Sequence, residues 1–232
     1  TCCTYDTDLT GAVGVATCPP PPPSLPSPPS PPPSPPPSPP PPSAPPTATT
    51  MSDTGCNAWL GATLIHLDRH NADCGANDVM QRWYGAYHGC TTTGYGKIQY
   101  TCTTPPAVWG STQHDTGAQL YGDGIDYLDR FNVDCEQHGA GKVMSQWDMD
   151  ATGSGQSKIK YTCVETHILS TRDLETACDL TVGKKLEYLD RHTIDCGSGQ
   201  AIQKWHMVDC DGINSRFTYT CALLALGPSP PP

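Results

Sequence analysis

The chain has 232 residues, and 20 of its 26 prolines lie between Pro19 and Pro46, which excludes one globular domain spread over the whole length. The net charge is −10, with 13 Lys and Arg against 23 Asp and Glu and no basic cluster, so nucleic acid is not an expected partner. The longest aliphatic run, Ala222 to Leu226, is too short to span a membrane. Thirteen cysteines without a C-x-x-C pair predict an extracellular, oxidising compartment.

Residues 1–18 contain three cysteines, Cys2, Cys3 and Cys18. The repeats described below end in Tyr-Thr-Cys, and Thr1-Cys2 resembles the tail of a preceding copy. We therefore expect a bridge between Cys3 and Cys18. For Cys2 we expect a partner upstream of Thr1, in a longer chain that alternates Pro-rich rods with clusters of repeats. The alternative is a small secreted protein with one intermolecular disulfide.

Residues 19–46 form a tract of proline and serine that predicts a polyproline II rod, because proline fixes φ and lacks an amide donor. At about 3.1 Å per residue the rod would span roughly 85–90 Å. Its S-P-P-P units place Ser30, Ser34 and Ser38 on different faces of a threefold screw. This distribution favours a coat of O-linked sugars, and the alternative is a naked, stiff spacer. The candidate residues for hydroxylation or O-glycosylation are Pro28, Pro29, Ser30, Pro31, Pro32, Pro33, Ser34, Pro35, Pro36, Pro37, Ser38, Pro39, Pro40, Pro41 and Pro42.

The S-P-P-P tract resembles the rods of hydroxyproline-rich glycoproteins of plants and green algae, including extensin-like and pherophorin-like proteins. In those families the rod adjoins cysteine-rich globular parts. The chain contains no Asn-x-Ser/Thr sequon, so a glycan on it would be O-linked.

The rest of the chain contains a threefold internal repeat, which we divide into residues 47–104, 105–165 and 166–226. Residues 227–232 begin a second Pro-rich segment. The first copy has the blocks LIHLDRHNADC (64–74), VMQRW (79–83) and KIQYTC (97–102). The second has IDYLDRFNVDC (125–135), VMSQW (143–147) and KIKYTC (158–163), and the third has LEYLDRHTIDC (186–196), AIQKW (201–205) and RFTYTC (216–221).

The cysteines of the repeats predict their own pairing. Copies one and three carry four cysteines each, whereas copy two carries only Cys135 and Cys163. An unpaired cysteine is prone to unwanted oxidation in an oxidising compartment. Two cysteines that are both absent from copy two are therefore expected to be bonded to each other in the other copies. Among the three connectivities that four cysteines allow, we predict Cys74–Cys102, Cys135–Cys163 and Cys196–Cys221 as the common bridge, with Cys56–Cys90 and Cys178–Cys210 in addition.

Each block predicts a β-strand. Ile98, Tyr100 and Cys102 alternate with polar residues, the period of a half-buried strand. Leu64 with His66, Ile125 with Tyr127 and Leu186 with Tyr188 alternate in the same way. We therefore predict an all-β fold of three disulfide-stapled repeats plus the extended rod. The repeats are either separate beads or one pseudo-threefold body such as a β-trefoil.

Other recurring residues are predicted to be structural. His70 and His192 share a repeat position with Phe131, which favours packing over metal binding. The pairs Asp68/Arg69, Asp129/Arg130 and Asp190/Arg191 could grip a carboxylate or a sugar, but structural ion pairs to neighbouring strands are favoured. The aspartates before the bridge cysteines, Asp73, Asp134 and Asp195, are expected to hydrogen-bond a turn.

Trp83, Trp147 and Trp205 are the candidates for a sugar-binding surface. Trp83 and Trp205 lie in Q-x-W, similar to ricin-type trefoil lectins, whereas copy two reads Ser-Gln-Trp. Core packing is the favoured alternative for these residues. The sequence contains no nucleophile elbow, H-E-x-x-H or phosphate-binding glycine loop, so we expect no catalytic residue, metal or cofactor.

Together, the LDRH/LDRF…DC and Y-T-C blocks and the S-P-P-P tract resemble the mastigoneme-type glycoproteins, the ciliary hair proteins of green algae. The resemblance implies a structural, self-assembling extracellular filament with O-glycosylated rods. Its partners would be further copies of the chain and its attached glycans, at the cell surface, cilium or cell wall. The alternative is a secreted lectin-like module tethered to a wall or matrix by the Pro-rich stalk.

Overall fold

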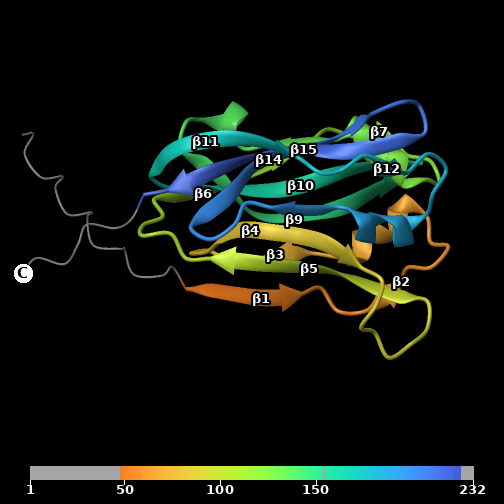
Figure 1. Ribbon diagram of the computed structural model, residues 1–232. Coiled ribbons are helices and arrows are strands. Elements are labelled where there is room, and N and C mark those ends of the chain that lie inside the picture. Colours follow the sequence, from red (N-terminus) through yellow and green to blue (C-terminus); the bar gives the residue numbers. More distant parts are fainter. Residues whose placement is uncertain (1–47, 154, 226–232) are drawn as a thin grey trace, which may run out of the picture. The chain divides into compact units, whose positions relative to one another are not determined.

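The computed structural model describes residues 48–153 and 155–225, so the predictions for residues 1–46 and 227–232, including Cys3–Cys18 and the rod, lie outside it. The described residues form strands and short 3-10 helices around one main core (Figure 1), and the all-β prediction is confirmed. The strands are β1 (Thr49–Asp53), β2 (Asn57–Ala58), β3 (Ala72–Asp73), β4 (Val79–Ala86), β5 (Tyr95–Thr103), β6 (Gly110–Asp115), β7 (Gln119–Leu120), β8 (Asn132–Asp134), β9 (Lys142–Gly153), β10 (Gln156–Glu165), β11 (Ile168–Glu175), β12 (Asp179–Leu180), β13 (Thr193–Asp195), β14 (Gln200–Asp209) and β15 (Asn214–Leu224). The helices are η1 (Leu64–Arg69), η2 (Ile125–Arg130), η3 (Glu136–His138) and η4 (Leu186–Arg191).

The described strands form three antiparallel sheets. We give each sheet the number of the repeat that supplies most of its strands. Sheet 1 has the order β1-β5-β4-β13, sheet 2 the order β6-β10-β9-β3 and sheet 3 the order β11-β15-β14-β8. The short strands β2, β7 and β12 extend the edges beside β1, β6 and β11. Each sheet has the same strand arrangement because the three repeats have the same blocks in the same order.

The repeats exchange strands in a ring. Repeat 1 lends β3 to sheet 2, repeat 2 lends β8 to sheet 3, and repeat 3 lends β13 to sheet 1. Each repeat therefore completes its neighbour, and the described residues form one pseudo-threefold body rather than separate beads. The body is built from three distinct sheets and not from the closed barrel of a β-trefoil.

The blocks that begin at Leu64, Ile125 and Leu186 are 3-10 helices, so the strand prediction for them is wrong. Their buried residues are spaced by three, which matches the three residues per turn of a 3-10 helix and not the alternation of a strand. These pairs are Leu64 and Leu67, Ile125 and Leu128, and Leu186 and Leu189. A strand of two or three residues follows each helix, and it is the one that joins the neighbouring sheet.

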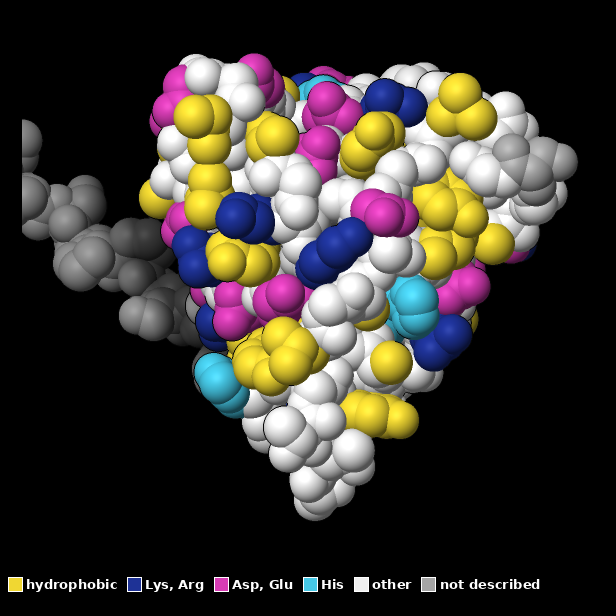
Figure 2. All heavy atoms as spheres, turned by 90° about the vertical axis from the view of Figure 1, so that its right-hand side faces the viewer, with side chains coloured by type: hydrophobic (Ala, Val, Ile, Leu, Met, Phe, Trp, Pro, Cys, Tyr) yellow, Lys and Arg dark blue, Asp and Glu magenta, His cyan; other side chains and the backbone are white. Residues whose placement is uncertain are grey.

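The two ends of the body differ. Strand β1 begins and strand β15 ends at the same end, whereas η1, η2 and η4 lie at the opposite end (Figure 1). Figure 2 views this second end, which has a triangular outline and carries hydrophobic side chains among charged and polar ones. No helix in the described residues is long and apolar enough to cross a membrane.

Candidate functional site

The described cysteines form five disulfides with the pairing that the comparison of copies predicts. The bridges are Cys56–Cys90, Cys74–Cys102, Cys135–Cys163, Cys178–Cys210 and Cys196–Cys221. Cys74 directly follows β3, which is paired in sheet 2, while Cys102 lies on β5 of sheet 1. The common bridge therefore ties each lent strand to the sheet of its own repeat. Five disulfides in the described residues indicate an extracellular, oxidising environment.

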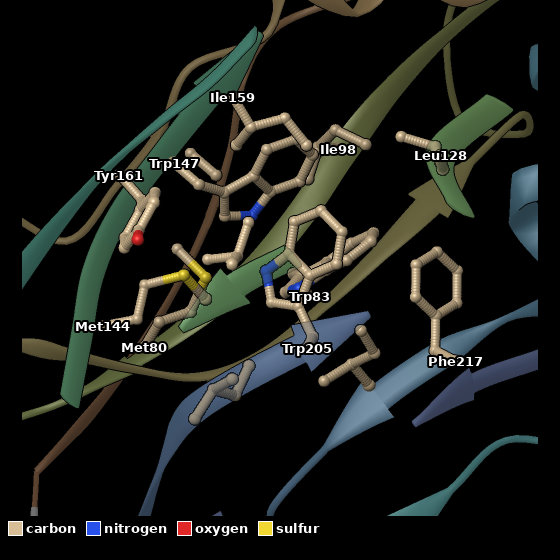
Figure 3. Packing of buried hydrophobic residues seen from close by; sticks show 14 of the residues in the cluster. Met80, Trp83, Ile98, Leu128, Met144, Trp147, Ile159, Tyr161, Trp205 and Phe217 are labelled. Carbon is tan, nitrogen blue, oxygen red and sulfur yellow. The ribbon is translucent and has the colours of Figure 1, made fainter. Parts of the chain in front are cut away.

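Trp83, Trp147 and Trp205 form the centre of the core and not a binding surface. Each is 1% exposed. Each comes from a different sheet, and their ring centroids lie 4.8, 5.2 and 5.6 Å apart (Figure 3). A sugar can stack only on an accessible ring face, so the sugar-binding alternative for these three residues is wrong. Their place explains why every copy carries a tryptophan at this position, since the three repeats meet there.

His70 and His192 are buried packing residues at the position that Phe131 occupies in copy two. The Nδ1 atom of His70 lies 2.7 Å from the hydroxyl of Thr54, and its ring packs edge-on against Trp59. Burial lowers the pKa of His70 to about 4, so its ring is neutral at physiological pH. Burial also lowers the pKa of His192. A neutral ring fits a core position that phenylalanine also fills.

The arginines of the Asp-Arg pairs are turned toward the short edge strands. Arg69 donates to the side chain of Asn57 on β2, Arg130 to the carbonyl oxygen of Leu120 on β7, and Arg191 to the carboxylate of Asp179 on β12, at 3.2, 2.8 and 2.7 Å. Each arginine thus fastens a helix to the edge strand of its own repeat. The predicted ion pair to a neighbouring strand forms at Arg191, whereas Arg69 and Arg130 donate to neutral oxygens, and all three Asp-Arg pairs lie on helices rather than strands.

The aspartates that precede the bridge cysteines hydrogen-bond turns, as expected. Asp73 accepts from the amide of Gly75 at 2.7 Å, and Asp195 accepts from the amide of Gly197 at 2.8 Å. Asp134 accepts from the amides of Glu136 and Gln137 at the start of η3. These carboxylates shape the chain directly after each lent strand.

A second histidine pair was not singled out by the sequence. His114 on β6 and His138 on η3 stack with ring centroids 3.4 Å apart, and His138 Nε2 lies 2.9 Å from the hydroxyl of Tyr161. Burial, followed by the charge of His138, lowers the pKa of His114. Helix η3 has no counterpart in copies one and three, so the comparison of copies gave no signal for this contact.

The outer face of sheet 3 is hollowed, with a volume of about 540 Å³. Strands β8, β11, β14 and β15 all contribute to its lining, so both repeat 2 and repeat 3 build it. Its side chains include carboxylates, hydroxyls, an amide, Lys204 and His206. We call it the sheet 3 groove. Leu174 and the buried residues Trp205 and Tyr219 complete the lining, and its polar side chains can recognise a polar molecule by hydrogen bonds.

No group of three or more His, Cys, Asp or Glu side chains that could hold a metal ion is found in the described part of the chain. No protein-family model, curated protein or solved structure matches this chain.

Proposed function

We propose that the protein is a structural extracellular glycoprotein, a subunit of a self-assembling filament of the mastigoneme or ciliary hair type. The observation that carries the proposal is a closed, disulfide-stapled body directly followed and preceded in the sequence by Pro-rich segments. The prolines and serines of residues 28–42 would carry O-linked sugars. This role uses no catalytic residue, metal or cofactor.

The body is suited to bear load because its three sheets are locked to one another. The three common bridges each tie a lent strand to its own repeat, so separating two sheets requires breaking strand pairing while a covalent link remains. These bridges close loops with sequence separations of 28, 28 and 25 residues. Each is worth about 3 kcal/mol in the chain-entropy model.

The positions of the chain connections also support a filament subunit. Strands β1 and β15 connect to the flanking sequence at one end, so the opposite end of the body carries no connection to either flank (Figure 1). That end exposes apolar side chains from all three repeats, namely Leu60, Leu120, Val182 and Ile213. A surface of this kind is available for contact with a neighbouring subunit.

Electron microscopy of the native material tests the proposal. We expect fibres in which bodies alternate with thin, sugar-coated segments, and a mass above that of the polypeptide until the O-glycans are removed. Native material that consists of single, unassembled particles of unmodified mass would contradict it.

A further inference from the structure

The sheet 3 groove is a regular grid of polar side chains set by the strand register. One row crosses the sheet through Asn132, His206, Thr218 and Glu175. The next row runs through Asp134, Lys204, Thr220 and Asp173. Residues two apart on a strand share a face, so both rows face outward, away from the tryptophan core. The volume of about 540 Å³ lies within the range of small-ligand sites, about 300–1,000 Å³.

At the centre of the groove Thr218 is short where the other copies carry long side chains. In sheet 1 the same position is Gln99, which accepts a hydrogen bond from Tyr84 on the neighbouring strand. In sheet 2 it is Lys160, whose amino group lies 2.7 Å from the carboxylate of Asp150. Each of these pairs joins the two central strands of its sheet. In sheet 3 a threonine leaves the centre open.

The groups around Thr218 include both acceptors and donors. His206 donates from Nδ1 to the carbonyl oxygen of Phe131 at 3.0 Å, because a carbonyl can only accept, and its Nε2 is then left as an acceptor when the ring is neutral. Asn132, which is exposed, presents a side-chain amide with both functions. Lys204, in the next row on the same face of β14, is a donor and lies 3.3 Å from Glu136.

The three carboxylates of the lining are all engaged with the protein. Glu175 pairs with Arg216 at 3.0 Å, and Asp134 accepts backbone amides of the turn into η3. Asp173 accepts the hydroxyl of Thr220 at 2.5 Å. The lining is therefore not a bare acidic cluster that would favour a cation. It is a mixed set of acceptors and donors held in place by hydrogen bonds within the sheet.

We propose that the sheet 3 groove binds a neutral saccharide. A sugar hydroxyl both donates and accepts, so a row of alternating hydroxyls matches a grid in which an amide, an imidazole acceptor, hydroxyls and an ammonium group lie side by side. The two aromatic residues of the lining, Trp205 and Tyr219, are buried in the core, so the groove offers no exposed aromatic ridge of the kind that grooves for bare polyproline II segments use. The saccharide is either an O-glycan on a neighbouring copy, which rests on the proposed function, or a saccharide of another source.

A glycan array of neutral pentose and hexose oligosaccharides, probed with the full chain made without glycosylation, tests the groove. We expect binding of at least one oligosaccharide, measured afterwards by isothermal titration calorimetry. Thr218→Lys places the side chain of copy two in the groove and is expected to weaken binding by about tenfold or more, as the loss of well-placed hydrogen bonds does. Gln99→Lys adds the same side chain at the same position of sheet 1 and is the matched control, expected to bind like the parent.

A second arm identifies the source of the sugar. Sedimentation velocity of the native glycosylated chain mixed with the unglycosylated chain shows whether the two associate. Association that Thr218→Lys and free oligosaccharide both abolish assigns the ligand to the O-glycans of another copy, whereas array binding without this association assigns it to a saccharide of another source. An array that retains no oligosaccharide, or an equal loss in Thr218→Lys and Gln99→Lys, overturns the inference. If electron microscopy shows fibres but the protein binds no saccharide, the saccharide proposal is overturned and the filament proposal stands. If the protein binds a saccharide but forms no fibres, the filament proposal is overturned and the saccharide proposal stands.

Discussion

Replacing His70 by phenylalanine is expected to make the protein less sensitive to acid. His70 is 1% exposed, and the Nε2 atom of its ring has no hydrogen-bond partner. Burial, then the charges of Arg69 and His66, lowers the pKa of His70 from 6.5 to about 4. Copy two shows that the site accepts a phenyl ring, because Phe131 is fully buried at the same position.

The size of the effect follows from the difference between the folded and unfolded pKa. Because the folded-state pKa of His70 is the lower one, the unfolded chain binds an extra proton between pH 6.5 and about 4. The free energy of unfolding is therefore unaffected above pH 6.5 and falls as the pH decreases through this window. The fall amounts to about 3 kcal/mol. His70→Phe removes this loss. The hydroxyl of Thr54 keeps the hydrogen bond that it accepts from the amide of Ile98.

Urea unfolding with the disulfides intact, carried out at neutral pH and at about pH 4, measures the difference. On going from neutral pH to about pH 4, the free energy of unfolding of the parent chain should fall by about 3 kcal/mol more than that of His70→Phe. His167→Phe, which changes an exposed histidine, is the control. Its free energy of unfolding should fall between the two pH values by as much as that of the parent chain. An acid-induced loss that is the same in His70→Phe and in the parent would refute the reasoning, because the buried ring would then not be the group that binds the proton.

Three further substitutions probe the packing. Gly96→Ala is expected to cost about 1–3 kcal/mol, because the new Cβ would lie 2.5 Å from the ring of Trp59; a neutral result in thermal unfolding would contradict that close approach. Replacing Cys135 and Cys163 together by alanine is expected to cost about 3 kcal/mol in urea unfolding, since repeat 2 has no second bridge among its described residues, and unchanged stability would show that this bridge does not constrain the body. Trp205→Ala is expected to cost about 3–5 kcal/mol by calorimetry, and a loss below about 1 kcal/mol would contradict the central packing of the three indoles.

The disulfide pairing was predictable because the chain contains its own comparison. Cys56 and Cys90 have no counterparts in copy two, and cysteines that are absent together identify a bonded pair. The 3-10 helices were not predicted, because in a block of six residues the apolar positions fit both a period of two and a spacing of three. Only the burial of Leu67, one turn after Leu64, distinguishes the two. The tryptophans were ambiguous for a similar reason, since a lone tryptophan in a repeat suits both a core and a sugar platform.

The sequence alone determined the repeat, the all-β class and the pairing of ten cysteines, because these depend on local periodicity and on differences between copies. Tertiary structure alone decided that the repeats close into a ring, since β3, β8 and β13 are too short to signal a partner and pair with the sheet of another repeat. Tertiary structure alone also decided which side chains form the sheet 3 groove. The side chains around Thr218 come from four strands and two repeats, and the sequence does not show that β8 of repeat 2 joins the sheet of repeat 3.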